Sequence, residues 1–402
     1  MTSRKNERPG SIVRRTPWPG SASRPVVSPL QASVVYAAES PDSLDAQYEG
    51  RLQGYAYARE GHPNADVLAG KIDRMEGAEG GIVLGSGMAA VGVVMLGLLD
   101  AGDHVIGSDL LYGRTLRMLR EDLPRRGIRT DLVDATDAGA IESAIRPETK
   151  LILIEVVSNP TIRVADVAGI ARIAHERGIR LAIDNTFTTP RGFRPFEIGA
   201  DIVIHSITKL LAGHSDATLG YAAARDPADR EAMAIAAATW GFTPSPFDCW
   251  LAERGLHTFD LRYERAAANA AALADHLAGL DGVRRVVYPG RADHPDHARA
   301  TELVGDRYGN MLSFEIEGGR AGANALVRAM PELPFAPTLG DVGTTLSHPA
   351  TSSHRGLSPE QRAGMGVSEG FFRVSVGVEE IGLLTGEFSA GVAAARAAGP
   401  AL

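Results

Sequence analysis

Residues 180–209 read RLAIDNTFTTPRGFRPFEIGADIVIHSITK, and this stretch decides the fold class. It contains two short apolar runs, RLAID and DIVIH, each followed by polar residues. Runs of this length that are rich in isoleucine and valine are typical of strands buried on both faces, as in a largely parallel sheet. Comparable runs within residues 80–224 predict further strands of the same sheet, namely GIVLG, HVIGS, RTDLV and LILIEVV.

Helical patterns separate these runs. The segment from Asp166 to Arg177 places Val167, Ile170 and Ile173 on one face, as an amphipathic helix does. Alternation of strands and helices predicts an α/β layer fold with right-handed crossovers. Ligands of such sheets bind beyond the carboxyl ends of the strands, so we expect the site in the segments that follow the strands.

The pattern changes after about Gly255. A long alanine-rich helix is expected over residues 261–280. It is followed by the strand MLSFEIEG, a helix near residues 322–329, the strand FFRVSVG and a final helix from Glu379. These elements predict a second, smaller α+β domain. The Gly- and Pro-rich stretch 331–353 is expected to be a long loop, and such loops are often functional.

The composition excludes several classes of function. With 402 residues, of which 44% are hydrophobic, the chain can bury a large core. The net charge of -8 offers no basic surplus for nucleic acid. Cys249 is the single cysteine, which excludes an intrachain disulfide and a multi-cysteine metal site. This use of cysteine fits a reducing cytoplasm.

Neither a membrane span nor a metal site is expected. No apolar run reaches the ~20 residues that a membrane span requires. No apolar segment follows the basic N-terminus as it does in a signal peptide. His205, His214 and His348 do not have the spacing of a zinc site. We therefore expect a cytoplasmic protein without a metal.

Lys209 follows the run DIVIHS, within HSITKLLAGHSD (205–216), and is flanked by the hydroxyls of Ser206 and Thr208. A lysine at a strand end is more often a solvated surface charge. Here two hydroxyls can bind a phosphate while the amine reaches an aldehyde. A lysine that forms a Schiff base must be neutral to react, and partial burial near cationic groups lowers its pKa. We interpret Lys209 as a candidate nucleophile.

Two other segments follow predicted strands. Asp184 ends RLAID, where it either caps the next turn or pairs with a cation such as a protonated pyridine nitrogen. GSGMAA (85–90) follows GIVL and opens a helix. Its glycines let backbone N–H groups approach an anion, although packing alone explains many such turns. It is not a P-loop, because no Gly-Lys-Ser/Thr ending follows.

A set of segments together resembles the transsulfuration, or Cys/Met-metabolism, family of pyridoxal-phosphate enzymes. That family contains cystathionine γ-synthase, cystathionine β- and γ-lyases, methionine γ-lyase and the O-acylhomoserine sulfhydrylases. The resemblance covers about residues 26–397. The segments that carry it follow one another in this order: YAREGHPN (57–64), GSGMAA (85–90), LYGRT (111–115), EVVSNPT (155–161), AIDNTFTTP (182–190), HSITKLLAGHSD (205–216), PFDCWLAERGLHT (246–258), TLGDVGTTLSHPA (338–350) and FRVSVGVEE (372–380).

The resemblance implies the fold-type I, aminotransferase-like architecture. We expect an N-terminal arm over residues 1–58, a cofactor-binding domain with a mostly parallel sheet over residues 59–255 and a C-terminal α+β domain over residues 256–402. It further implies pyridoxal 5′-phosphate as the cofactor, an amino acid as the substrate and a homotetramer built from tight dimers.

The resemblance also implies roles for single residues. Lys209 forms the Schiff base and moves protons, Asp184 pairs with the pyridine nitrogen, and Tyr112 stacks on the ring and assists catalysis. Tyr57 and Arg59 reach the phosphate of the neighbouring subunit. The other expected cofactor ligands are Gly87, Met88, Asn159, Ser206 and Thr208, and the expected substrate ligands are Arg373 for the carboxylate, Thr338, Asn159 and Arg114.

The departures from the family pattern concern the substrate side. Leu210 stands where many members have tyrosine, and Arg114 where they commonly have glycine or cysteine. Pro337 and Thr338 stand where a variable residue is followed by serine, and Gly343 replaces a residue that is frequently acidic or lysine. The cofactor set is intact.

Two reactions share their early steps in this family. A C–S lyase of the cystathionine or methionine γ-lyase type eliminates at Cγ or Cβ of a sulfur-containing L-amino acid. A transferase of the cystathionine γ-synthase or sulfhydrylase type replaces the acyl group of an O-acylhomoserine with a thiol. We favour the lyase and keep the transferase as the alternative. An inactive homologue is disfavoured because Lys209, Asp184, Tyr112 and Arg373 are all retained.

Overall fold

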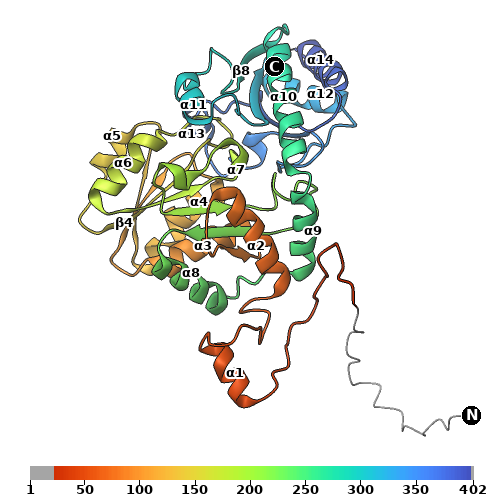
Figure 1. Ribbon diagram of the computed structural model, residues 1–402. Coiled ribbons are helices and arrows are strands. Elements are labelled where there is room, and N and C mark those ends of the chain that lie inside the picture. Colours follow the sequence, from red (N-terminus) through yellow and green to blue (C-terminus); the bar gives the residue numbers. More distant parts are fainter. Residues whose placement is uncertain (1–21, 400–402) are drawn as a thin grey trace, which may run out of the picture.

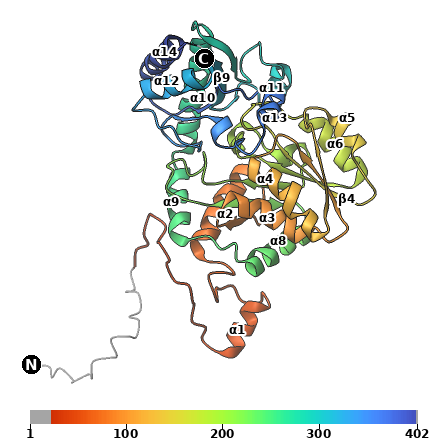
Figure 2. The same cartoon turned by 180° about the vertical axis from the view of Figure 1, so that it is seen from behind.

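The computed structural model describes residues 22–399, so the first part of the expected arm, residues 1–21, lies outside the described residues. Figures 1 and 2 show a body with two sheet-containing parts, from which an N-terminal segment extends away. That segment carries the short helix α1 (Pro41–Tyr48), none of whose residues is buried. No helix of the described residues is long and apolar enough to cross a membrane.

The larger sheet has seven strands in the order β1-β7-β6-β5-β4-β2-β3. Strands β3, β2, β4, β5 and β6 pair in parallel, and β7 is antiparallel to both of its neighbours, β6 and β1. The expected mostly parallel sheet is thus confirmed. Its strands are β1 (Ile82–Leu84), β2 (His104–Ser108), β3 (Arg129–Val133), β4 (Thr149–Glu155), β5 (Arg180–Asp184), β6 (Ile202–His205) and β7 (Gly220–Ala224).

Continuous apolar runs form the strands because helices cover both faces of the sheet. Leu151 and Leu153 of β4 pack into a cluster on one face, whereas Ile152 and Ile154 pack into another on the opposite face. The two faces alternate along a strand, so both must be apolar. The covering helices are α2 (Pro63–Glu76), α3 (Gly87–Leu98), α5 (Ala138–Ser143), α6 (Val167–Arg177), α8 (Pro227–Trp240) and α9 (Pro246–Leu256).

The smaller sheet has four antiparallel strands in the order β10-β11-β9-β8. Helices α10, α12 and α14 gather on it at one end of the molecule (Figure 1). The expected smaller α+β unit is therefore present. Its elements are α10 (Phe259–Ala278), β8 (Val283–Val287), β9 (Met311–Ile316), α12 (Gly319–Ala329), β10 (Thr345–Ser347), β11 (Phe371–Ser375) and α14 (Ile381–Ala397).

Stretch 331–353, expected from the sequence to be a long loop, is in part regular secondary structure. It contributes β10, which pairs with β11, and the short 3-10 turn η4 (Pro349–Thr351). The edge of the small sheet therefore orders part of this stretch. The remaining short helices are α4 (Gly113–Arg117), the π-turn η1 (Met118–Asp122), η2 (Pro124–Arg126), α7 (Thr189–Gly192), η3 (Pro195–Ile198), α11 (His297–Val304) and α13 (Pro359–Gly364).

Candidate active site

Most of the residues singled out in the sequence meet in one cavity of about 290 Å³. It lies where β4, β5 and β6 end and α3 begins, and β11 of the smaller sheet supplies Arg373. This is the edge of an α/β sheet at which ligands bind. The predicted residues that line it are Gly87, Met88, Tyr112, Asn159, Asp184, Ser206, Thr208, Lys209, Thr338 and Arg373.

Lys209 is half-buried in the turn after β6. Burial and, to a lesser extent, the charge of Arg373 lower the pKa of its amine. The turn is held from α10, because the Arg262 guanidinium donates to the Leu210 carbonyl at 2.8 Å. A lowered pKa increases the fraction of neutral amine, and the neutral amine is the form in which a lysine attacks an aldehyde.

The loop that precedes β10 packs directly on this turn. Gly340 has φ +82°, and a Cβ there would lie 2.5 Å from the Leu210 nitrogen and 2.9 Å from the Lys209 Cα. Its own backbone N–H donates to the Ser375 hydroxyl at 2.8 Å. Both the dihedral angle and the close approach require glycine, so this loop restrains the lysine from the side of the smaller sheet.

Asp184 is held by its neighbour two residues on. The Thr186 hydroxyl donates to the Asp184 carboxylate at 2.5 Å and the Thr186 backbone N–H at 3.0 Å. The same hydroxyl accepts from the Ser206 backbone N–H at 2.8 Å. Burial raises the pKa of the Asp184 carboxyl, while the Thr186 hydrogen bonds and the charge of His205 act in the opposite direction. A cationic ring nitrogen beside it would favour the ionised form further.

The start of α3 forms an anion cradle with the lysine turn. Ser86 caps the helix by accepting from the Ala89 backbone N–H at 3.0 Å. A Cβ on Gly87 would lie 2.6 Å from the Ser206 Cβ, so only glycine lets these segments approach so closely. The helix N-terminus and the Ser206 hydroxyl provide donors and a positive dipole end suited to a phosphate. The Thr208 hydroxyl also lines the cavity, where it donates to the Leu219 carbonyl at 3.1 Å.

Arg373 enters the cavity from β11 and is buried. It donates to the Asn159 side chain at 2.8 Å and to the Thr338 carbonyl at 2.5 Å. Its Nε is also buried and has no hydrogen-bond partner within residues 22–399. Burial lowers the pKa of this guanidinium to about 10, although the charge of Tyr112 acts in the opposite direction. A buried donor without a partner indicates a missing acceptor, and a carboxylate supplies one.

Tyr112 lies at the start of α4 with its ring partly exposed to the cavity. Its backbone N–H donates to the Glu155 carboxylate at 2.7 Å. Glu155 also lines the cavity, and it was missed in the sequence. It ends the apolar run LILIE just as Asp184 ends RLAID, so the same signal was available. Burial and then the charge of Asp184 raise the pKa of Glu155 well above its usual value.

Three predicted residues do not line this cavity. Arg59 lies over the ring of Tyr57, at 5.6 Å from its centroid, and donates to the Ala238 carbonyl at 3.1 Å. Both border a surface groove with Phe247 instead. Arg114 is exposed on α4 and forms no hydrogen bond or ion pair among the described residues. The structure therefore places these three side chains outside the chain's own cavity.

None of the three histidines considered as a zinc set lines this cavity. His205 contacts the buried Glu76 carboxylate. His214 bonds the Ala212 carbonyl at 2.7 Å, and His348 bonds the Glu369 carbonyl at 2.9 Å. Each imidazole therefore has its own structural partner.

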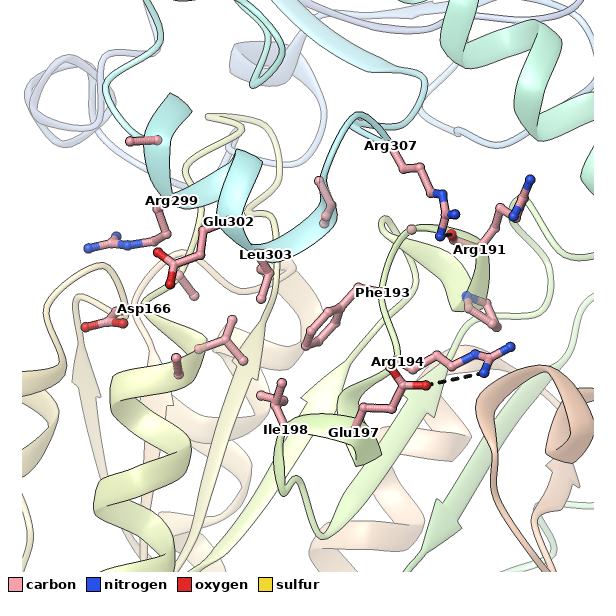
Figure 3. Close-up of a pocket in the computed structure, with 17 residues that line it drawn as sticks. Asp166, Arg191, Phe193, Arg194, Glu197, Ile198, Arg299, Glu302, Leu303 and Arg307 are labelled. Carbon is pink, nitrogen blue, oxygen red and sulfur yellow. Dashed lines mark hydrogen bonds and ion pairs between the residues drawn. The ribbon is translucent and has the colours of Figure 1, made fainter.

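A larger cleft of about 840 Å³ lies between α6, α7 and α11 (Figure 3). It shares no lining residue with the cavity around Lys209. Several of its charged groups already have partners: Arg194 contacts Glu197 at 3.3 Å, and Arg191 contacts Glu264 at 2.6 Å. By size alone this cleft would be the candidate active site. The smaller cavity is the better candidate, because polar groups with shifted pKa values converge in it.

The smaller cavity fits pyridoxal phosphate. Lys209 offers an amine for the aldehyde, Asp184 a carboxylate for the ring nitrogen and the start of α3 a cradle for the phosphate. The unpartnered Nε of Arg373 leaves a position for the carboxylate of an amino acid.

Comparison with known proteins gives the same result over the whole chain. The family described as Cys/Met metabolism PLP-dependent enzyme matches residues 12–393. The chain is 40% identical to cystathionine beta-lyase of Bacillus subtilis, over 83% of this chain and 85% of that enzyme. It is 36% identical to L-methionine gamma-lyase of Pseudomonas putida, over 89% of each chain.

A solved structure is also similar. Cystathionine gamma synthase from Xanthomonas oryzae pv. oryzae, in complex with cystathionine, superposes with a TM-score of 0.87 at 34% identity. The match covers 93% of this chain and 94% of that one. The fold, the cavity and these comparisons agree, and the chain belongs to the Cys/Met metabolism family of pyridoxal-phosphate-dependent enzymes.

Proposed function

We propose that this enzyme is a C–S lyase that eliminates at Cγ or Cβ of a sulfur-containing L-amino acid. The observation that carries the proposal is the buried, unpartnered Nε of Arg373 in the cavity that also holds Lys209. A guanidinium there can bind the α-carboxylate of an amino acid in a bidentate manner. The lyase names of two relatives support the choice of reaction.

In the proposed mechanism, bound pyridoxal phosphate supplies an electron sink that stabilises negative charge at the substrate Cα. Asp184 would hold the proton on the ring nitrogen, and Thr186 keeps the Asp184 carboxylate in place. Lys209, with its lowered pKa, takes the Cα proton as a general base. Arg373 and Asn159 fix the substrate carboxylate so that the Cα–H bond faces the lysine.

Replacement by a thiol is the second candidate. One similar structure is a cystathionine gamma synthase, and the early proton transfers required of Lys209 are the same. The two reactions differ in whether a thiol occupies the cavity when the leaving group departs. Pro337 and Thr338 line that cavity, whereas Arg114 lies outside it.

The deciding experiment is a substrate panel with the purified protein. Cystathionine, methionine, homocysteine and O-acylhomoserines are each incubated with and without added thiol. The proposal expects 2-oxobutanoate or pyruvate without thiol. A thioether that forms only when thiol is present assigns the transferase instead. Amino transfer to an oxoacid, with no reaction at Cβ or Cγ, overturns both.

We further propose a homotetramer of tight dimers as the working assembly. In its support, the N-terminal segment, which extends from the body in Figure 1, carries several apolar side chains that are exposed. Exposed apolar side chains that gather in one segment are typical of an interface. The exposed residues are Val26, Val27, Leu30, Val34, Val35, Tyr48, Leu52 and Tyr57.

A further inference from the structure

Glu155 and Asp184 form a pair of adjacent carboxyl groups in the wall of the cavity. Strands β4 and β5 are parallel neighbours, and the register places Glu155 opposite Asp184. Each residue is the last of its strand, and each lines the cavity. Paired strands lie about 4.8 Å apart, so two side chains at matched positions on one face are neighbours.

The two carboxyl groups have different hydrogen-bond partners. Asp184 accepts two hydrogen bonds from Thr186. Glu155 accepts one, from the backbone N–H of Tyr112 at 2.7 Å. Hydrogen bonds donated to a carboxylate favour its ionised form, so the pair is unequal. If a proton is retained, it belongs on Glu155.

The surrounding charges lead to the same assignment. Asp184 is the charged group that acts on Glu155 from β5, and it raises the pKa of Glu155 in addition to the effect of burial. Across the cavity the facing groups are Lys209, Arg373 and the Tyr112 hydroxyl. On the other side of β4 lies β2, and Asp109 is the carboxyl group that follows it. The charges that act on Asp109 come from Asp134 and Arg120. Two adjacent carboxylates in a half-buried cavity wall disfavour double ionisation.

The hydrogen bond from the Tyr112 backbone N–H to Glu155 links the pair of carboxyl groups to the turn that carries the Tyr112 ring. Tyr112 is the first residue before α4, and its side chain forms no capping hydrogen bond there. Among the described residues, its backbone N–H donates to the Glu155 carboxylate. A shift of the Glu155 side chain would therefore move the turn that carries the Tyr112 ring.

We propose that Glu155 is a positioning residue that stays protonated while Asp184 is ionised, and that it holds Tyr112 against the bound cofactor through the Tyr112 backbone. This rests on the proposed pairing of Asp184 with the ring nitrogen. With Glu155 neutral, Asp184 is the single negative charge beside the ring, and the proton on the ring nitrogen is not shared between two acids.

The test compares two substitutions in the holoenzyme without substrate. Glu155→Gln keeps the shape and the acceptor oxygen but is permanently neutral. Glu155→Leu removes the acceptor. We expect Glu155→Gln to keep the visible circular dichroism of the bound cofactor and its dissociation constant within about twofold. We expect Glu155→Leu to lose most of the dichroism and about tenfold in cofactor affinity, because the Tyr112 turn is released.

A titration separates this role from a merely structural one. As pH rises, Glu155 of the wild type should ionise and disturb the cofactor's absorption, and Glu155→Gln should lack this alkaline step. An infrared band of a protonated carboxyl group should be present in the wild type and absent in Glu155→Gln. Glu148→Gln, at a half-buried position before β4 where the carboxylate pairs with Arg129 at 3.4 Å, is the matched control.

Two results overturn the proposal. If Glu155→Gln loses the cofactor signal as Glu155→Leu does, the residue acts as an anion. If Glu155→Leu, folded by far-ultraviolet circular dichroism, keeps the full signal, the hydrogen bond does not hold Tyr112. If Glu155→Leu fails to fold, Glu155→Asp takes its place in the test, because it withdraws the acceptor oxygen by one methylene. None of these readouts needs a substrate, so they fail independently of the proposed reaction.

Discussion

Lys209 combines a half-buried amine with a nearby guanidinium, and both features act on its protonation. Burial and Arg373 lower its pKa from the usual 10.5. A lowered lysine pKa means that the neutral, reactive form appears at a lower pH than in an exposed lysine. The cavity thus prepares the amine for the cofactor before any substrate is present.

This predicts a pH dependence for cofactor uptake. The rate at which the cofactor-free protein binds pyridoxal phosphate should rise with pH, with a midpoint below 10.5. In Arg373→Leu the midpoint should move upward, because a positive neighbour is removed. Stopped-flow absorption of the cofactor measures both. Lys209→Ala should give no Schiff-base band. Lys150→Ala, at the exposed second residue of β4, should behave as wild type. A wild type without such a band contradicts the assignment.

Asp184 carries a second prediction. Asp184→Asn should retain some cofactor but lose roughly 100-fold or more in turnover, because the ring nitrogen is no longer held protonated. Thr186→Val should lose less, since the backbone hydrogen bond at 3.0 Å remains. Steady-state kinetics on both variants, with Asp100→Asn at an exposed position as the control, measure this. Near-normal turnover in Asp184→Asn would remove Asp184 from the mechanism.

Single residues were predictable where a distinct local pattern marks them. Lys209 between two hydroxyls and Asp184 at the end of an apolar strand both lie in the cavity. Glu155 carries the same strand-end signal but was not singled out. Its partner Tyr112 lies 43 residues earlier, and no sequence spacing reveals such a contact.

Among the elements, the loop around Gly340 connects the two sheets at the lysine. Gly340→Ala should lower stability by roughly 1–3 kcal/mol, because it adds both backbone strain and an overlap with the lysine turn. It should also weaken cofactor retention. Thermal unfolding and dialysis against buffer measure the two effects.

The control for this prediction lies in α14. Gly386 is exposed in the helix, and a Cβ there would meet no atom within 4 Å. Gly386→Ala should leave cofactor retention unchanged and stabilise the protein by up to about 1 kcal/mol. If Gly340→Ala behaves like Gly386→Ala, the loop does not restrain Lys209.

Strands β4, β5 and β6 were predicted from the sequence, whereas β7 was not. The runs around β4, β5 and β6 were identified by their isoleucine and valine content. Strand β7 reads GYAAA, which is not a β-forming pattern, yet it is fully buried between two strands. Small side chains fit there because α3 lies close: a Cβ on Gly220 would be 2.1 Å from the Ser86 carbonyl oxygen. Tertiary packing overrides local propensity at such a strand.

For the whole molecule, the positions of Tyr57 and Arg59 carry the last prediction. Neither lines the chain's own cavity, although the family resemblance assigns them to a cofactor phosphate. Mixing Arg59→Ala with Lys209→Ala should therefore restore up to about a quarter of the activity. In a mixed dimer, one of the two sites has Lys209 from one chain and Arg59 from the other, and that site is intact. Activity after subunit exchange, verified by a tagged partner, measures this.

Two controls make the result decisive. Arg59→Ala mixed with itself should stay inactive, and Arg51→Ala, at an exposed residue of the same segment, should retain activity alone. If exchange occurs without any recovery, each chain builds its own site and the assembly proposal loses its basis.

The place of β7 in the sheet has a consequence for how the chain is made. In the sheet described for residues 22–399, β1 pairs with β7 alone. A chain emerging from the ribosome exposes β1 long before Gly220–Ala224 have been synthesised. Until then its backbone groups have no strand to bond, and an open strand edge invites association with other nascent chains. The first strand of the sheet therefore reaches its position only after more than half of the chain has been translated.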